Sequence, residues 1–296
     1  ALQGVNSTTA GSTGKVLAAS LFNYDSLGFT VNNLTSTDES GATLGAVNYL
    51  GQAAFQSPGP GRQPSVAIAA NQRVIATLDE RISSSVYEVN GRIYMVNTVD
   101  DLSDGLDESR VRYTILDANT FAILDEGNIG EAGYDYYQGS IAVNEFGEVA
   151  IGYNRSGLDP TTGKISFMAQ LFRTMADGSL QSMGSEMLLK ESLVDDYHNG
   201  SLFGQAAAGR QRWGDYSQVS VDPSNAHNFY LIGQFAREYN NAAGGHPGGT
   251  GGSRWGTFIA VLTTPVPEPE TWAMMVFGFG FMGYAMRRRR YSASFA

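Results

Sequence analysis

A guanidinium, a carboxylate and a phenol lie close together in the sequence and supply residue types that sugar chemistry uses. They belong to Arg212, Asp215 and Tyr216. Together with Arg81 and Arg112, they are candidates by type for a glycoside hydrolase, which positions acidic groups around the bond that it cleaves. The same segment also fits a structural corner, in which aromatic rings fill space, Asp215 caps a turn and Arg212 pairs with it. We favour the structural interpretation, so no catalytic residue is predicted.

Other residue types that commonly carry catalysis or bind metals show no productive spacing. The chain contains no cysteine, which excludes disulfides, thiolate metal sites and cysteine nucleophiles. The histidines, His198, His227 and His246, are too irregularly spaced for a helical or hairpin metal site. The sequence has no Gly-x-Ser-x-Gly nucleophile elbow. We therefore predict no metal site and no cofactor.

Two loop sequences match ligand-binding loops in composition but not in pattern. Residues 100–108 are acidic and could offer carboxylates and carbonyls to calcium. Their spacing misses the EF-hand pattern, so we favour a solvated acidic hairpin tip. Residues 244–252 are rich in glycine but lack the Gly-Lys-Ser/Thr of a phosphate loop, which predicts a flexible connection between strands.

The elements that must position these side chains are predicted to be β-strands. No stretch before residue 265 shows a sustained helical period, whereas alternating or β-branched segments recur throughout. Turn sequences such as Asn90-Gly91 separate them, which is typical of antiparallel hairpins. The predicted strands are residues 15–22, 65–70, 73–78, 85–89, 92–99, 110–116, 140–143, 148–153, 164–173, 218–221, 228–235 and 257–262.

A strand-turn-strand pattern repeats along the chain. It covers residues 140–153, returns at residues 218–235, and has a weaker copy at residues 85–96. Each unit, extended by one or two more strands, matches the construction of a four-stranded propeller blade. We therefore predict an all-β fold, a β-propeller that is incomplete in this chain. It would have three clear blades and a fourth from residues 15–49, with a β-sandwich as the alternative.

The amino-acid sequences of several segments resemble those of bacterial exported propeller proteins that are distantly similar to sialidases. The matching segments are residues 79–81, 90–92, 136–143, 212–217 and 221–223, and the likeness spans residues 75–262. It implies a propeller fold more than a chemistry, because propellers host many unrelated functions.

The end of the chain differs in composition from the body, residues 1–264. Residues 265–271 contain Pro-Glu-Pro, residues 272–286 carry no charge, and residues 287–296 begin with four arginines. As a helix, the fifteen uncharged residues would extend about 22 Å, which is short of the ~30 Å hydrocarbon core. Aromatic residues near both ends and the arginines nevertheless favour a transmembrane-type helix with a basic cytoplasmic tail.

This order of segments closely resembles the PEP-CTERM sorting signal. The resemblance implies export in a Gram-negative bacterium that makes exopolysaccharide, and processing by an exosortase, a membrane transpeptidase-like enzyme. It assigns sorting and processing to Pro267, Glu268 and Pro269. The expected membrane anchor comprises Trp272, Phe277, Gly278, Phe279, Gly280, Phe281, Gly283 and Tyr284, and the basic cluster comprises Arg287, Arg288, Arg289 and Arg290.

Charge and sorting together define the expected function. The four arginines and two glutamates of the tail leave 15 basic and 27 acidic residues in the body, a formal charge of −12. Such a surface argues against nucleic-acid partners. We expect a precursor tethered to the inner membrane with its body on the periplasmic side, which then reaches the cell surface or the medium. The favoured role is non-catalytic binding or matrix function linked to exopolysaccharide, with an extracellular glycan as ligand. The alternative is an exported glycan-acting hydrolase.

The start of the chain also raises an expectation. The sequence begins at Ala1 with neither an initiator methionine nor a signal peptide, although a sorting signal requires export. We expect either a cleaved leader or missing upstream sequence. The second is favoured because the last repeat unit lacks an outer strand, which the amino terminus supplies in many propellers.

Overall fold

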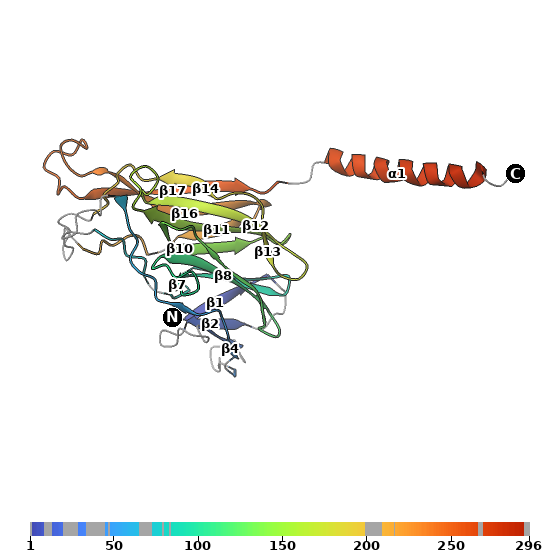
Figure 1. Ribbon diagram of the computed structural model, residues 1–296, viewed down its shortest axis with the longest axis horizontal. Coiled ribbons are helices and arrows are strands. Elements are labelled where there is room, and N and C mark those ends of the chain that lie inside the picture. The colour runs from blue at the N-terminus through green and yellow to red at the C-terminus, as the bar shows by residue number, and fades with distance from the viewer. Residues whose placement is uncertain are drawn as a thin grey trace. The chain divides into compact units, whose positions relative to one another are not determined.

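The computed structural model describes most of the chain. The described residues are 2–8, 14–19, 29–33, 45–46, 48–64, 73–78, 80–82, 84–198, 209–215, 217–265 and 269–292. They are mostly β-strands, followed by one C-terminal helix. The chain divides into two compact units, Ala1–Leu262 and Thr263–Ala296. Figure 1 labels their elements.

The first strands of the body form the edge of a nine-stranded sheet. β1 (Leu2–Ser7), β2 (Lys15–Ala19), β3 (Phe29–Asn33) and β4 (Asn48–Leu50) pair antiparallel in chain order. The second half of β1 then pairs parallel with β6 (Val86–Val89), which joins these strands to the rest of the sheet. The short β5 (Phe55–Gln56) pairs with the end of β7.

The remainder of this sheet is an antiparallel meander. It runs from β6 through β7 (Arg92–Asp101) and β8 (Ser109–Asp117) to β9 (Ile123–Ile129). Asn90 and Gly91 connect its first two strands with φ angles of 52° and 73°. Two successive positive φ angles match the right-handed twist of a tight hairpin, and Asn-Gly is the pair that adopts them most readily.

The first two strands of the second sheet, β10 (Tyr134–Val143) and β11 (Glu148–Gly157), are buried on both faces. The sheet also contains β12 (Ser166–Thr174), β13 (Leu180–Ser182) and β14 (Met187–Glu191). Because strand side chains alternate between faces, Ile141 and Ile151 pack toward the β6–β9 meander. Their neighbours Ala142 and Ala150 pack toward the third sheet. This arrangement has more than the two layers of a sandwich, because the second sheet packs against the β6–β9 meander on one face and against the third sheet on the other.

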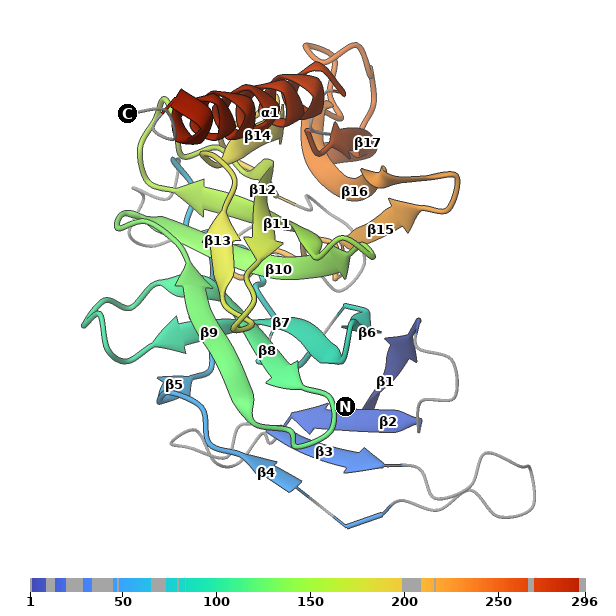
Figure 2. The same ribbon diagram turned by 90° about the vertical axis from the view of Figure 1, so that its right-hand side faces the viewer.

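The third sheet completes the body. It contains β15 (Gln218–Asp222), β16 (Asn225–Tyr239) and β17 (Ser253–Thr263). Phe229 and Leu231 on β16 are buried against the second sheet, whereas Tyr230 and Ile232 between them are exposed. In Figures 1 and 2 the body passes from β1–β4 at the bottom of the view, through the β6–β9 meander and the second sheet, to this sheet near the top.

Three strands approach one another: β6, which begins the β6–β9 meander, and β10 and β15, which begin the second and third sheets. Tyr87 Oη donates a hydrogen bond to the carbonyl of Val219 at 3.4 Å, and Val219 N–H donates to Ser140 Oγ at 2.9 Å. Ser217 Oγ donates to the carbonyl of Gln138 at 2.7 Å. Gln138 lies at a register shift of β10 and has a φ of 53°, unusual for a residue with a side chain. The start of the third sheet therefore contacts both β6 and this kinked part of β10.

Several sequence predictions are confirmed and others are corrected. The hairpins predicted at residues 85–96, 140–153 and 218–235 are present, each within a meander of its own. Within the described residues the sheets are open and form no closed propeller. The strand predicted at residues 73–78 is wrong. Ile75 makes single bridges to Gly61 and Gln211, and its apolar character instead reflects its burial beside aromatic residues. The strand predicted at residues 65–70 lies outside the described residues.

The C-terminal helix α1 (Pro269–Ser292) covers the predicted run of residues 272–286 and extends beyond it at both ends, into the Pro-Glu-Pro segment and the basic tail. The expectation that it crosses a membrane is not supported, since no helix in the described parts of the chain is both long and apolar enough. Its 24 residues extend about 36 Å, but the uncharged run occupies only part of that length, with charged residues on either side.

Candidate functional site

The structure separates the residues that were grouped by type as hydrolase candidates. Arg212 and Asp215 lie together, with 3.0 Å between Nη2 and a carboxylate oxygen, and both are partly exposed. Tyr216 lies outside the described residues. Arg81 is exposed just before β6. Arg112 is buried within β8, so the predicted candidates do not form one cluster.

Arg112 has a structural environment. It is among the largest fully buried side chains of the protein. Its guanidinium donates to the carbonyl of Ala53 at 2.7 Å and to Asn128 Oδ1 at 2.9 Å, and lies 3.8 Å from Asp101. Its charge also lies over the ring of Phe55, at 5.3 Å from the centroid. These contacts tie the segment around β5 to the meander, so this arginine supports the fold.

The acidic loop of residues 100–108 is a hairpin tip, as predicted, but its ends are not solvated. Residues 102–107 are exposed between β7 and β8, whereas Asp100, Asp101 and Glu108 are buried. Glu108 accepts hydrogen bonds from Arg110 and Arg62, at 2.8 and 2.7 Å. Burial opposes ionisation of Glu108, but these hydrogen bonds outweigh it and hold its pKa below the ordinary value. The positive charges that pair with this carboxylate are the guanidinium groups of Arg62 and Arg110.

The three histidines lie at separate places and contact different residues. His227 Nδ1 lies 3.0 Å from Glu148, and its ring stacks on Phe146 with centroids 4.5 Å apart. His246 lies 3.3 Å from Glu238. The ring of His198 leans against Tyr239 at 5.5 Å. Across the described residues, no three His, Asp or Glu side chains are grouped as a metal site would require.

A Tyr/Glu pair is present, but its tyrosine is buried. Tyr153 Oη donates to Glu186 Oε1 at 2.9 Å, and Arg155 Nη1 lies 2.6 Å from the other carboxylate oxygen. The tyrosine is fully buried between the first and second sheets. Burial and the Glu186 charge raise its pKa far above the ordinary value. A phenol that stays protonated and inaccessible is suited to packing rather than to attack on a sugar.

The Arg212–Asp215 pair lines a cavity of about 240 Å³. We call it the aromatic cavity. Its lining residues are Tyr197, Arg212, Trp213, Gly214, Asp215, Gln234 and Trp255. Trp255 projects from β17 with 60% of its surface exposed, whereas Trp213 is buried. The cavity therefore combines a solvent-facing indole with an ion pair and an amide.

Packing beneath the cavity fixes its wall. The rings of Tyr197 and Trp213 meet edge to face, with centroids 4.8 Å apart, a favourable geometry for aromatic pairs. Tyr197 Oη donates to the carbonyl of Arg212 at 2.8 Å, and Tyr197 N–H donates to Gln63 Oε1 at 2.7 Å. The segment that carries Arg212 is thus attached to buried structure.

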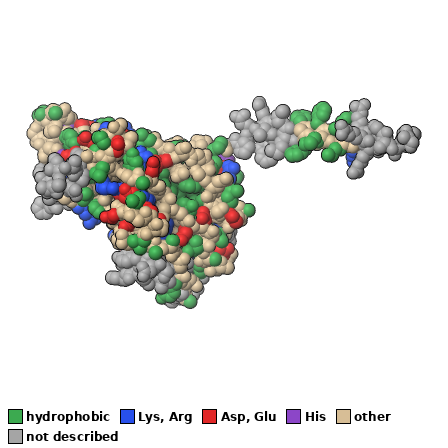
Figure 3. Space-filling model, in the orientation of Figure 1, with side chains coloured by type: hydrophobic (Ala, Val, Ile, Leu, Met, Phe, Trp, Pro, Cys, Tyr) green, Lys and Arg blue, Asp and Glu red, His purple; other side chains and the backbone are tan. Residues whose placement is uncertain are grey.

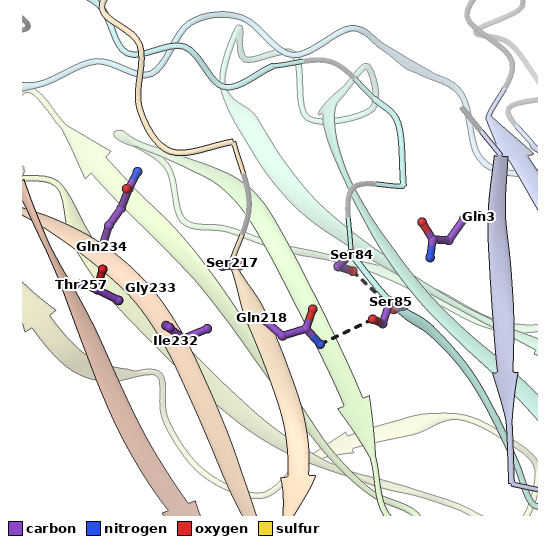
Figure 4. A pocket seen from close by; sticks show the side chains of 9 residues that line it. All are labelled: Gln3, Ser84, Ser85, Ser217, Gln218, Ile232, Gly233, Gln234 and Thr257. Atoms are coloured by element: carbon purple, nitrogen blue, oxygen red, sulfur yellow. Dashed lines mark hydrogen bonds between the residues drawn. The ribbon is translucent and has the colours of Figure 1, made fainter.

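A second cavity, of about 430 Å³, lies where the third sheet approaches β1 and the start of β6. We call it the amide cavity. Three glutamines line it, Gln3, Gln218 and Gln234, as do four hydroxyl residues, Ser84, Ser85, Ser217 and Thr257. Ile232 and Gly233 complete the lining. Figure 4 shows Gln218 between Gln234 and Gln3, with the three glutamines on different strands. Gln234 lines both cavities.

The sequence did not indicate these cavities. Gln3 comes from β1, whereas Gln234 and Trp255 come from the consecutive strands β16 and β17 at the other end of the body. One local signal was present: Trp255 begins an alternation with Thr257, Ile259 and Val261 in which every second residue is exposed. An indole on the open face of a strand is a candidate for ligand contact.

The predicted sorting residues are only partly described. Pro267 and Glu268 lie outside the described residues, and Pro269 begins α1. Farther along the helix, the expected anchor residues from Phe277 to Tyr284 are exposed, as is Arg287.

On the face of the body drawn in Figure 3, Lys and Arg side chains are scattered among Asp and Glu rather than gathered in a patch.

The end of the chain matches a known family description. Residues 265–290 match the PEP-CTERM protein-sorting motif, which confirms the resemblance found in the sequence. This motif marks an exported protein that an exosortase processes and sorts to the cell surface, and the chain is therefore such a protein. The match covers the terminal segment and none of the body.

Comparisons of the body are less informative. An endo-arabinase from Bacteroides thetaiotaomicron is 9% identical with a TM-score of 0.26, over 90% of this chain and 94% of that chain. A protein of unknown function from Dyadobacter fermentans is 13% identical with a TM-score of 0.28, over 84% of this chain and 74% of that chain. Scores at this level do not establish a shared fold. No curated protein matches the sequence.

Proposed function

We propose that the exported body binds an extracellular glycan through the aromatic cavity, in a non-catalytic role within the exopolysaccharide matrix. The observation that carries this proposal is the exposure of Trp255 beside the Gln234 amide and the Arg212–Asp215 pair. A sugar ring presents C–H groups on its faces and hydroxyls at its edges. An indole offers a flat apolar surface to the C–H faces of the sugar. Amide, guanidinium and carboxylate groups form hydrogen bonds with its hydroxyls.

Binding fits the cavity better than hydrolysis does. Glycosidases of the common type place two carboxyl groups on either side of the scissile bond, roughly 5–9.5 Å apart. Among the described residues that line the two cavities, Asp215 is the one carboxylate, and Arg212 occupies it. A single carboxylate paired with a guanidinium can accept hydrogen bonds from sugar hydroxyls, but it does not supply the second carboxyl group that hydrolysis of the common type uses.

The proposal includes a propeller-like arrangement of the body. It is supported by the mutual contacts of the initial strands β6, β10 and β15, and by the face-to-face packing of successive meanders. Propeller blades likewise place their first strands at a common centre and pack neighbouring blades face to face. The amide cavity lies next to this convergence, since Ser217 lines it and also contacts Gln138.

Sorting supplies the location in which this binding acts. We propose that the exosortase recognises Pro267, Glu268 and Pro269, in which the two prolines lack backbone N–H donors. The Arg287–Arg290 cluster follows at the far end of the uncharged run. Removal of this segment would leave the acidic body at the surface, where its ligand is a secreted polysaccharide.

The test is a glycan array probed with the purified body, residues 1–264, in wild-type form and as Trp255→Ala. We expect binding to a set of polysaccharide fragments that the variant loses. Equal array profiles for the two proteins would contradict the proposed site. Reducing-end assays on every bound fragment address hydrolysis, and steady release of new reducing ends by the wild type would favour the hydrolase alternative.

A further inference from the structure

We propose that the amide cavity is a second saccharide subsite, continuous with the aromatic cavity, which fits the protein to a linear neutral polysaccharide rather than to a single sugar. This inference rests on the proposed glycan-binding function and names the substrate class. It is carried by the chemistry of the lining, by the hydrogen bonds already made within it, and by one side chain that lines both cavities.

The lining of the amide cavity selects a neutral ligand. Its nine residues include three amides and four hydroxyls and no charged side chain, although 16% of the protein is charged. Phosphate, sulfate, carboxylate or metal ligands call for charged groups to offset their desolvation. Amides and hydroxyls each both donate and accept, which matches the hydroxyl groups of an uncharged sugar. At about 430 Å³, the cavity falls within the ~300–1,000 Å³ typical of ligand sites.

The existing hydrogen bonds divide the lining into a fixed wall and free groups. Gln218 Nε2 donates to the carbonyl of Val219 at 2.7 Å, and Ser217 Oγ donates to the carbonyl of Gln138 at 2.7 Å. These side chains are held in place. Gln3 and Gln234 are half-buried, and within the described part of the chain their amides make no hydrogen bond. Both amides line the cavity without an internal partner in the described residues, so they can donate and accept hydrogen bonds with a ligand.

Gln234 connects the two cavities. It lines both, and its amide packs directly against Gly214, where any larger residue would displace it. A polysaccharide that stacks one sugar on Trp255 can therefore extend past Gln234. Its next sugar would then lie among Gln218, Ser85 and Gln3. The amide of Gln234 would contact the linkage between the two units. Occupation of both cavities requires a ligand longer than one residue.

The experiment is calorimetric titration of the purified body with neutral linear glucans, mannans, xylans and galactans of increasing length, from monosaccharide to octasaccharide. For wild type, we expect the affinity for the ligand series that binds to rise about tenfold or more once the chain spans both cavities. In Gln3→Ala, the ratio of long-chain to short-chain affinity should fall towards one. Gly214→Ala should do the same by displacing Gln234. The exposed residue Gln181 lies outside both cavities, and Gln181→Ala should keep the wild-type ratio.

Each result has a defined meaning. If short chains bind and Trp255→Ala abolishes that binding, but length adds nothing, the second subsite is wrong while the aromatic site stands. A gain with length that Gln3→Ala and Gly214→Ala both preserve also overturns the subsite. Preferential binding of uronic-acid or sulfated oligosaccharides, included as a parallel series, contradicts the neutral ligand class. No binding by wild type overturns both this subsite and the proposed function. Urea unfolding of each variant verifies that it is folded.

Discussion

Ser217 Oγ donates a hydrogen bond of 2.7 Å to the carbonyl of Gln138, although 79 residues separate them in the chain. Next to it, the backbone N–H of Val219 donates to Ser140 Oγ at 2.9 Å. The start of the third sheet is therefore fixed to the kinked strand β10 by two hydroxyl groups. Both serines are buried, and Ser217 also lines the amide cavity, so the same contacts support the fold and shape the site.

The first prediction concerns this attachment. In Ser140→Ala, the buried N–H of Val219 loses its acceptor, and an unsatisfied buried donor costs roughly 1–3 kcal/mol. We expect the free energy of unfolding in urea to fall by about that amount. Exposed Ser182→Ala should change it by less than about 0.5 kcal/mol. Equal stability of Ser140→Ala and wild type would show that the contact does not hold the sheets together.

A second prediction separates the two arginines that seemed alike in the sequence. Arg112→Ala removes a buried guanidinium and leaves Asp101 without its cation, which should destabilise the body by about 3–5 kcal/mol. Arg112→Lys should recover little of this loss, because an ammonium group cannot reproduce the forked contacts. Arg212→Ala, at an exposed ion pair, should cost no more than about 1 kcal/mol. The reverse order in chemical unfolding would refute the structural role of Arg112.

Acid stability should depend on Glu108. Its pKa in the folded body lies below the ordinary value, because hydrogen bonds from Arg110 and Arg62 outweigh the effect of burial. The ionised carboxylate therefore stabilises the fold above its unfolded pKa of about 4.3, and this contribution is lost as pH falls through the lower folded pKa. Glu108→Gln should be less stable than wild type at neutral pH, with a difference that shrinks on acidification.

The measurement is urea unfolding across this pH range, with Glu145→Gln in an exposed turn as control. That variant should follow the wild-type profile. A constant stability difference between Glu108→Gln and wild type at every pH would mean that ionisation of Glu108 contributes nothing.

Sorting gives a cellular prediction. Replacing Pro267, Glu268 and Pro269 with alanine should block processing, so that a full-length precursor accumulates and the surface pool of the body falls. Immunoblots of membrane and surface fractions would measure both. Ser294→Ala lies beyond the residues that match the sorting motif and should be processed as wild type. Normal processing of the triple variant would remove the assigned role of these residues.

Local pattern predicted the hairpins but not the cavities. Asn90-Gly91 and the alternating segments around Ile141 and Ile151 specify turns and buried faces within a few residues, so the meanders were visible in the sequence. β9, Ile123–Ile129, was missed because it is mostly half-buried and polar, without a clean alternation. The apolar pattern around Ile75 predicts a strand, but these residues serve burial in a cluster rather than sheet pairing.

Function-bearing contacts depend on packing between distant segments. Arg112 matched a catalytic residue by type, yet its position in β8 buries it. Gln3 joins Gln234 at the amide cavity only because β1 and the third sheet approach one another, whereas Trp255 and Gln234 come from neighbouring strands of that sheet. No spacing along the chain records that approach. The sorting segment was predicted more completely because its information is linear: Pro-Glu-Pro, an uncharged run and arginines in fixed order.

The most direct test of the account is the affinity of Trp255→Ala for the oligosaccharide that binds the wild-type body most tightly, measured by calorimetric titration. Tyr230→Ala is the matched control, because this aromatic residue is 42% exposed on the same sheet and lines neither cavity. We predict a loss of about tenfold or more for Trp255→Ala, equal to at least ~1.4 kcal/mol, and wild-type affinity for Tyr230→Ala. Wild-type affinity in Trp255→Ala would contradict the central claim that the aromatic cavity binds the glycan.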